Sequence, residues 1–172
     1  HVCALASEEM EKPILLPNNW PNGKYMLLFD PLDGSSNTDN NMPLGAIFSV
    51  LKYGRTDRLP TEADLIRRGT EQVAAGYLLY GSSTMLVYTV GQGVYGFTLD
   101  PDIGEYLLSH ERMRIPEKGK VYAANEGNYN KWPDGIRKYL DSLKVTDKAT
   151  GRPYSARYSG CLVADVHRLL LG

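Results

Sequence analysis

The apolar residues of this chain gather in short runs bounded by turn residues, a pattern typical of strands. Residues 26–29 form a continuous apolar run between Tyr25 and Asp30, which predicts a central strand that delivers Asp30 to its carboxyl end. Residues 44–51 resume the same strand character. Residues 72–99 are rich in Tyr, Val, Leu and Thr and are punctuated by glycines, which favours several strands joined by turns over one long helix.

Three other segments carry helical signals. Residues 61–64 are typical of a helix start inside a charged surface excursion, and the apolar spacing across residues 136–143 predicts an amphipathic helix. A third helical period covers residues 161–170, with Ser159 or Gly160 as the expected N-terminal cap. Strands and helices therefore alternate irregularly, and the predicted fold class is α+β, a mixed α/β arrangement.

The remaining segments are loops, turns and short strands by composition. Turn-forming residues predict a loop at residues 18–23 and a hairpin connection at residues 100–104. Short strands are expected at residues 106–108 and 121–124. Between these strands, residues 110–120 shift to charged composition, and this segment is the best candidate for a domain boundary.

Composition and charge narrow the class of partner. A net charge of −1 over 172 residues provides no basic surface for nucleic acid and no polybasic patch for a membrane. No apolar run reaches the roughly 18 to 20 residues of a membrane span, and no signal sequence is visible. Cys3 and Cys161 lie far apart without zinc-like spacing, so we expect free thiols and a cytoplasmic protein. The chain begins at His1 and ends on an apolar run, and we expect it to be an internal fragment.

Residues 30–36 combine two carboxylates, a rigid bend and a small hydroxyl-bearing loop. A phosphate monoester is anionic, so carboxylates alone would repel it and a hard cation has to intervene. Asp30 and Asp33 offer the oxygen ligands that Mg²⁺ or Mn²⁺ prefers. Pro31 bends the chain so that the Leu32 carbonyl can face the same ion. The alternative is a β-turn with an aspartate cap, and the local chemistry leaves both interpretations open.

The residues after Asp33 suit a phosphate group. Gly34 permits close approach of the backbone to a ligand. Ser35 and Ser36 offer hydroxyls and amides as at the start of a helix, where anions are favoured. These residues would therefore complete a carboxylate, metal and phosphate sandwich.

Five further positions have both a chemical and a structural interpretation. Glu8 and Glu9 follow an apolar run on a predicted strand, so their side chains would point to opposite faces. One could then bind a metal while the other holds a water or stays in solvent. The structural alternative is that both are ordinary surface residues, as acidic pairs usually are. Arg157 suits phosphate, and a structural ion pair is the equal alternative. His167 and Cys161 are interpreted as packing residues rather than ligands.

These motifs form a set that extends along essentially the whole chain. Its members are Ser-Glu-Glu at 7–9, Asp-Pro-Leu-Asp-Gly-Ser-Ser-Asn at 30–37, Val-Ala-Ala-Gly-Tyr at 73–77, Asn-Glu-Gly at 125–127, Arg-Tyr-Ser-Gly at 157–160 and Val-Ala-Asp-Val-His at 163–167. Together they resemble class I fructose-1,6-bisphosphatase. The Asp-Pro-Leu-Asp-Gly core alone would indicate only the wider group of lithium-sensitive sugar and inositol phosphatases.

The resemblance implies a metal site and a group that activates water. Glu8, Asp30, Asp33 and the Leu32 carbonyl match the family's metal ligands, with Mg²⁺ as the expected cofactor and Mn²⁺ as a substitute. Glu9 matches the second glutamate of the pair, which helps to activate the attacking water. Glu9 and Asp33 are therefore the expected catalytic residues.

The resemblance also implies where a sugar bisphosphate binds. Residues 33–36 match the segment that holds the 1-phosphate and the sugar. Asn125 and Tyr158 match contacts to the 6-phosphate end, and Arg157 matches an arginine that reaches the neighbouring subunit's active site. Tyr129 is a candidate for the phosphate-binding tyrosine, although one inserted residue before it leaves that match ambiguous.

Regulation and architecture follow from the same resemblance. Lys24 and Tyr25 match part of an AMP pocket, and Lys52 stands where some members carry an arginine, which leaves AMP inhibition open. The family assembles as a homotetramer. It has a layered αβαβα fold, expected to be incomplete here, with a regulatory half that includes the metal site at residues 1–109 and a catalytic half at residues 110–172.

The implied reaction is the Mg²⁺-dependent hydrolysis of the 1-phosphate of fructose 1,6-bisphosphate to fructose 6-phosphate and phosphate, a step of gluconeogenesis. A related sugar or inositol phosphatase, such as a sedoheptulose bisphosphatase, and a non-catalytic metal-binding or sugar-phosphate-binding remnant are the alternatives. The family's remaining glutamate ligand and phosphate-binding lysine would follow Gly172, so we expect this chain alone to be inactive. Residues 52–68 contain no cysteine, which disfavours a redox-switched chloroplast form.

Overall fold

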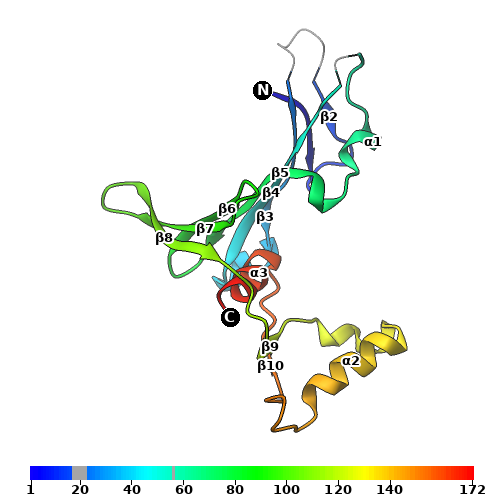
Figure 1. The fold of residues 1–172 in the computed structure, drawn as a ribbon, viewed down its shortest axis with the longest axis vertical. Helices are drawn as coiled ribbons and strands as arrows, with labels where there is room; N and C mark the ends of the chain where they lie inside the picture. The colour runs from blue at the N-terminus through cyan, green and yellow to red at the C-terminus, as the bar shows by residue number, and fades with distance from the viewer. Residues whose placement is uncertain (17–22, 56) are drawn as a thin grey trace.

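The computed structural model describes residues 1–16, 23–55 and 57–172. Of the loop predicted at residues 18–23, all but Gly23 lies outside the described residues. Figure 1 shows an elongated molecule in which one twisted sheet carries most of the chain, a helix lies against this sheet, and a smaller helical unit extends from it.

The large sheet contains eight strands in the described part of the chain, in the spatial order β2-β1-β3-β4-β5-β6-β7-β8. Its strands are β1 (Val2–Ser7), β2 (Ile14–Leu15), β3 (Tyr25–Asp33), β4 (Leu44–Lys52), β5 (Gln72–Tyr80), β6 (Thr84–Thr89), β7 (Val94–Asp100) and β8 (Glu105–Met113). β1 and β3 run parallel, and the pairs from β3 to β8 are antiparallel. The predicted central strand, the several strands across residues 72–99 and the hairpin connection at residues 100–104 are confirmed.

The helices lie outside this sheet. They are α1 (Glu62–Leu65), α2 (Asp134–Lys144) and α3 (Leu162–Leu171), with the 3-10 helices η1 (Ser35–Asn40), η2 (Gly69–Glu71) and η3 (Glu126–Lys131). The three predicted helices are therefore confirmed, and the mixed sheet with few helices confirms the mixed α/β class. The expected cap of α3 is wrong, since its N-cap residue is Cys161, which makes no side-chain capping bond.

Helix α3 packs on β4 and β5, and it covers one part of the sheet (Figure 1). The core consists of two clusters of buried residues, one beside α1 and one beneath α3. The first contains Cys3, Ala4, Met26, Leu51, Tyr53 and Leu65. The second contains Tyr77, Val87, Met113, Cys161 and Val163. The second cluster joins residues from β5, β6 and β8 to the last helix of the chain.

The segment between β8 and α3 forms a separate small unit. Two short parallel strands, β9 (Val121–Tyr122) and β10 (Ser155–Ala156), lie between the large sheet and α2 (Figure 1). β9 is shorter than the strand predicted at residues 121–124. β8 is longer than predicted, and it continues into the segment proposed as a boundary, because its pairing with β7 extends to Met113.

Candidate active site

The parallel pairing of β1 and β3 brings two predicted metal ligands together. Ser7 is the register partner of Phe29, and the Glu8 amide donates to the Phe29 carbonyl at 3.2 Å. Glu8, the first residue after β1, thus stands level with Asp30 on the neighbouring parallel strand β3. The carboxyl ends of such strands are common ligand sites in α/β proteins.

The pair Glu8 and Glu9 does not lie on the strand, which corrects the sequence interpretation. β1 ends at Ser7, and both glutamates belong to the turn that follows it. Strand alternation therefore does not set the directions of their side chains. Instead, the turn is closed by the Met10 amide, which donates to the Ser7 carbonyl at 3.2 Å, and both side chains are exposed.

The segment from Asp30 to Asp33 is an irregular end of β3 rather than a turn that leaves the strand. The pairing with β4 shifts register between these two aspartates, so the strand is bulged there. Oδ1 of Asp30 accepts a hydrogen bond from the Leu32 amide at 3.0 Å, and Leu32 is 39% exposed. The bend predicted at Pro31 is therefore built as a bulge within the strand.

Asp33 reaches across the molecule to helix α3. Its Oδ2 atom accepts a hydrogen bond from the Val163 amide at 2.6 Å and one from the Cys161 thiol at 3.0 Å. The carboxylate therefore caps the N-terminus of α3, where a negative charge is favoured. Cys161 is fully buried, and this burial, followed by the bond to Asp33, raises the pKa of its thiol to about 11. The thiol thus stays protonated at neutral pH and can donate.

The residues after Asp33 form the 3-10 helix η1. Gly34 precedes η1 with a φ of 77°, a left-handed conformation that glycine adopts without strain. The Asn37 amide donates to the Gly34 carbonyl at 2.8 Å, which closes the first turn. Ser35 and Ser36 are exposed, so their hydroxyls are available to a ligand.

The donor chemistry fits a hard divalent cation. In residues 1–16, 23–55 and 57–172, no three His, Cys, Asp or Glu side chains are grouped closely enough to hold a metal ion. Glu8 and Asp30 nevertheless stand side by side along the backbone at the ends of β1 and β3. Mg²⁺ is usually held by one or two carboxylates while waters and substrate phosphates complete its shell. These residues therefore fit an open cation site, in which waters and a bound ligand would supply the remaining oxygen atoms.

A hollow of about 600 Å³, which was not expected from the sequence, has Glu8 and Asp30 in its lining. Its lining is mainly apolar and includes Leu28, Ile47, Tyr77 and Val166, with Glu8 and Asp30 among the bordering residues. Leu28 and Asp30 lie two residues apart on β3, so they share a face of the sheet. That spacing is the sequence signal that could have indicated the hollow.

The second group of predicted residues gathers around the small sheet. β9 and β10 are parallel, and Asn125 follows the first while Arg157 and Tyr158 follow the second. The Arg157 amide donates to the Tyr122 carbonyl at 2.8 Å, and the Asn125 side chain accepts from the Gly127 amide at 3.2 Å. Tyr158 is 55% exposed. Three predicted substrate contacts thus lie at one edge of this sheet.

Two side chains of this group already have protein partners. The Arg157 guanidinium donates to the Ala156 carbonyl at 3.1 Å, and no ion pair between described residues involves it. The Tyr129 hydroxyl donates to Oδ2 of Asp141 at 2.6 Å, a bond that raises the pKa of Tyr129. A phosphate that binds Tyr129 would have to compete with this carboxylate.

His167 is a packing residue, as predicted. Its Nδ1 atom lies 3.0 Å from the Tyr77 hydroxyl, and the two rings meet edge to face with centroids 5.9 Å apart. Burial lowers the pKa of His167, and burial raises the pKa of Tyr77 far above its ordinary value. Both groups are therefore neutral at neutral pH.

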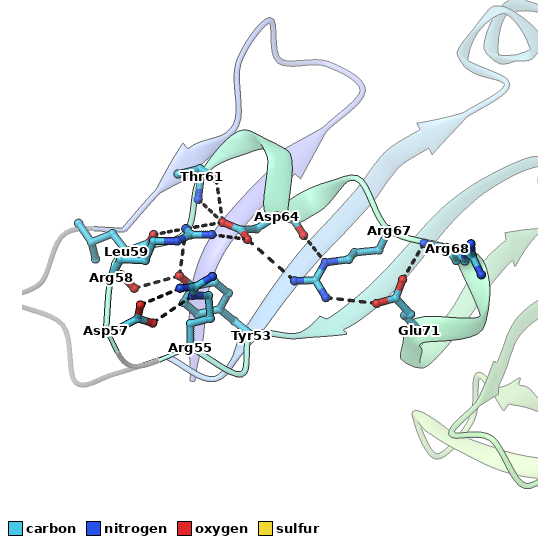
Figure 2. Close-up of polar contacts among 10 residues, drawn as sticks. All are labelled: Tyr53, Arg55, Asp57, Arg58, Leu59, Thr61, Asp64, Arg67, Arg68 and Glu71. Carbon is cyan, nitrogen blue, oxygen red and sulfur yellow. Dashed lines mark hydrogen bonds and ion pairs between the residues drawn. The ribbon is translucent and has the colours of Figure 1, made fainter.

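The predicted AMP-pocket residues lie together at the other end of β3 and β4. Tyr25 and Lys52 are register partners, and the Lys24 carbonyl accepts from the Tyr53 amide at 2.8 Å. The loop that follows Lys52 folds around an ion-pair network (Figure 2). Arg58 donates to both oxygens of Asp64 at 2.7 and 2.8 Å, so this carboxylate anchors the loop.

Comparison with known proteins places these features in a family. The profile described as "Fructose-1-6-bisphosphatase, N-terminal domain" matches residues 1–111, and the profile described as "Fructose-1-6-bisphosphatase, C-terminal domain" matches residues 115–172. The chain belongs to the class 1 fructose-1,6-bisphosphatase family. The resemblance inferred from the motifs is thereby confirmed.

Individual fructose-1,6-bisphosphatases support this assignment. The chain is 58% identical to the class 1 fructose-1,6-bisphosphatase of Chloroherpeton thalassium, in an alignment that covers 97% of this chain. It is 52% identical to that of Nostoc punctiforme, in an alignment that covers 99% of this chain. The crystal structure of Leishmania major fructose-1,6-bisphosphatase in the T-state superposes with a TM-score of 0.88 at 45% identity, over 98% of this chain and 53% of that one. The chain spans about half the length of the curated relatives it matches. No helix of the described ranges is long and apolar enough to cross a membrane.

Proposed function

We propose that the protein carrying this chain hydrolyses the 1-phosphate of fructose 1,6-bisphosphate to give fructose 6-phosphate and phosphate. The observation that carries the proposal is the match of both family profiles along the chain. The meeting of Glu8 and Asp30 at the ends of two parallel strands supports it, because it supplies the paired oxygen ligands that such a hydrolysis needs.

The metal ligands in this proposal are Glu8, Asp30, Asp33 and the Leu32 carbonyl, with Mg²⁺ as the cation and Mn²⁺ as a substitute. The bound cation would lower the pKa of the attacking water and offset the charge on the leaving oxygen. Glu9 would accept the proton of that water from its exposed turn. The fully buried Cys161 has no nucleophilic role, since its thiol stays protonated.

The substrate-binding residues in this proposal come from two places. Hydroxyls and amides of Gly34, Ser35 and Ser36 would hold the oxygens of the 1-phosphate, an electrostatic rather than covalent role. The 6-phosphate end would be bound by four residues near the small sheet, namely Asn125, Tyr129, Arg157 and Tyr158, with Arg157 serving a neighbouring subunit. Of these, Tyr129 needs to leave Asp141 before it can bind.

Regulation and assembly belong to the same proposal. Lys24, Tyr25 and Lys52 would form part of an AMP pocket in a cytoplasmic homotetramer, and the register pairing of Tyr25 with Lys52 supports their common location. A regulatory half at residues 1–109 and a catalytic half at residues 110–172 would divide the chain. The two profile matches, which meet between residues 111 and 115, support this division.

The test is phosphate release in the protein at its natural length. Asp33→Asn should lower the Mg²⁺-dependent release of phosphate from fructose 1,6-bisphosphate by more than about 100-fold. Mutation of a residue that only hydrogen-bonds to a metal ligand already lowers metal affinity or activity about 10- to 100-fold, and Asp33 is proposed as a ligand itself. Asp39→Asn, on the exposed surface of η1, is the matched control and should keep full activity. Circular dichroism checks that both variants fold.

Undiminished activity of Asp33→Asn would contradict the assignment of Asp33 as a metal ligand of this hydrolase. A panel with sedoheptulose 1,7-bisphosphate and inositol phosphates separates fructose-bisphosphatase from its sister phosphatases. Residues 1–172 alone should release no phosphate, because they span about half the length of the curated relatives. Calorimetric titration of this chain with metal and sugar phosphate would then identify binding without turnover.

A further inference from the structure

Asp33 is held by a part of the chain that lies about 130 positions away. Oδ2 of this carboxylate receives two hydrogen bonds, from the Val163 amide at 2.6 Å and from the Cys161 thiol at 3.0 Å. Within the described residues, no protein group donates to the other oxygen, Oδ1. One oxygen of Asp33 is therefore fixed by protein, and the other remains for a ligand.

The contact around these bonds is tight on both sides. A Cβ atom on Gly34 would lie 2.7 Å from the Cys161 Cβ, and one on Gly45 would lie 2.5 Å from the Val163 Cβ. Only glycine therefore permits this approach of the β3–β4 segment to α3. The carboxylate cannot shift relative to the helix without a change in the packing of both glycines.

A second tie holds the same two segments together. The Asn37 side-chain amide donates to the Pro43 carbonyl and to the Ser159 carbonyl, each at 3.0 Å. The Ser159 hydroxyl in turn donates at 2.9 Å to Asp165, on the first turn of α3. The loop before Cys161 is thus fixed independently of Asp33, so the thiol meets the carboxylate from a defined direction.

We propose that Cys161 is a positioning residue for Asp33: its thiol, together with the Val163 amide, holds Oδ2 and so determines that Oδ1 is the oxygen offered to a divalent cation. This inference rests on the proposed function, since it requires Asp33 to be a metal ligand. The partners that orient a metal ligand set its geometry, and their loss weakens metal affinity or activity about 10- to 100-fold. Sequence spacing gave Cys161 a packing role alone.

The two donors differ in what mutation can remove. The Val163 donor is a main-chain amide, so it remains whatever residue replaces Val163, except proline. The thiol can be deleted or exchanged. Cys161→Ala and Cys161→Val both remove the donor; alanine leaves the space of the sulfur empty, and valine fills it with methyl groups. Cys161→Ser restores a donor, because a hydroxyl can make the same bond to Oδ2.

The experiment measures Mn²⁺ affinity by electron paramagnetic resonance in the protein at its natural length, with thermal unfolding of each metal-free variant beside it. Cys161→Ala and Cys161→Val should bind Mn²⁺ about 10-fold more weakly than the wild type, and Cys161→Ser should bind within about twofold of it. Cys3→Ala is the matched control. Cys3 is also a buried thiol, and it donates to the Tyr25 carbonyl at 3.2 Å, so its loss should lower stability without a change in Mn²⁺ affinity.

Several results would overturn the inference. Wild-type Mn²⁺ affinity in a folded Cys161→Ala or Cys161→Val variant would do so, as would a serine variant that fails to restore binding. Loss of folding in both apolar variants would assign the thiol to the fold and count equally against a positioning role. If the wild type binds no Mn²⁺ and releases no phosphate, the proposed function itself fails. An active wild type with unaffected Cys161 variants removes only the present inference.

Discussion

Asp33 serves both the fold and the chemistry proposed for this chain. A carboxylate that caps a helix contributes roughly 0.5 to 2 kcal/mol of stability. In a metal site, the same carboxylate binds the cation through an oxygen atom, and its negative charge balances part of the cation's positive charge. Asn at this position keeps an oxygen that can accept the Val163 amide but removes the charge. Activity and stability should therefore separate in Asp33→Asn, which makes this variant informative about chemistry.

His167 should make stability depend on pH. Burial lowers its pKa below the ordinary value of 6.5, so the unfolded chain binds a proton more readily than the folded one as the pH falls. The contribution of His167 is fully present above pH 6.5 and is lost as the pH falls below this value toward the folded pKa. The midpoint of urea unfolding, measured between pH 7.5 and 5.5, should decrease less in His167→Gln than in the wild type.

What distinguishes the two proteins is the slope of the unfolding midpoint plotted against pH, not the midpoint at any single pH. His167→Gln also removes the edge-to-face contact with Tyr77, so its stability should be lower at every pH. Parallel curves for the wild type and His167→Gln would contradict the assignment of the pH effect to this histidine.

At the residue scale, the sequence predicted a chemistry but not the side chains' partners. The Asp-Pro-Leu-Asp-Gly run predicted oxygen ligands and a phosphate loop from residue types alone. The bond of Asp33 to Cys161 joins residues 128 positions apart, and no periodicity or spacing contains that distance. For the same reason, the engagement of Tyr129 by Asp141 was not predicted, since it depends on how η3 packs on α2.

The approach of α3 to β4 should tolerate no side chain at position 45. A Cβ on Gly45 would lie 2.5 Å from the Val163 Cβ and 2.6 Å from its Cγ1, in the core beneath the helix. Gly45→Ala should therefore destabilise the fold by about 1 to 3 kcal/mol through overpacking. Urea unfolding followed by circular dichroism measures this loss.

Gly135→Ala is the matched control for this prediction. Gly135 lies in the first turn of α2, and an added Cβ would meet no described atom within 4 Å. Alanine is the better helix former, so this variant should be neutral or more stable by up to about 1 kcal/mol. Equal effects of the two substitutions would refute the packing explanation.

The loop between β4 and β5 should depend on Asp64. This buried carboxylate accepts hydrogen bonds from Arg58 and from the Thr61 amide, and these bonds hold the pKa of Asp64 well below its usual range (Figure 2). Asp64→Asn should lower the melting temperature by several degrees at pH 7. The difference should shrink as the pH falls below 3.8, because the wild-type carboxylate then loses its charge as well.

Asp57 provides the contrast within the same loop. It pairs with Arg55 at 2.7 Å, but both side chains are more than half exposed. Exposed ion pairs contribute little to stability, so Asp57→Asn should leave the melting temperature nearly unchanged. A comparable loss in both variants would mean that burial does not govern the contribution of these pairs.

At the scale of elements, the sequence predicted what local pattern determines. Apolar periodicity located α2 and α3, and continuous apolar runs located β3 and β4. The errors concern places where tertiary contacts decide. β1 ends at Ser7 because its pairing with β3 stops there, and Glu8 and Glu9 enter a turn. α3 receives its cap from Asp33 rather than from Ser159 or Gly160.

The unit that contains α2 should open more readily than the large sheet. Figure 1 shows α2 away from that sheet, and in the described residues α2 makes no extensive contact with it. Amide hydrogens near Leu140 should therefore exchange faster than those of β3 to β6, once intrinsic rates are corrected. Hydrogen exchange followed by mass spectrometry tests this, and equal protection of the two regions would contradict it.

At the scale of the whole molecule, the pattern of apolar runs predicted the mixed α/β class and the set of motifs predicted the family. Neither could give the strand order or the place where α3 docks. Those features depend on which buried faces meet, such as Tyr77 and Val87 with Val163, and these residues come from distant parts of the chain. The hollow beside Glu8 and Asp30 also exists only once the sheet and α3 have been assembled.

The order of the strands has a consequence for how the chain folds. From β3 to β8, each strand pairs with its neighbour in sequence, so these pairings close short loops and should form early. Helix α3 returns to Asp33 across 128 positions and leaves the ribosome after all of these strands. During synthesis, the sheet can thus form well before Asp33 is capped. A nascent chain would hold the aspartate free in solvent until α3 arrives.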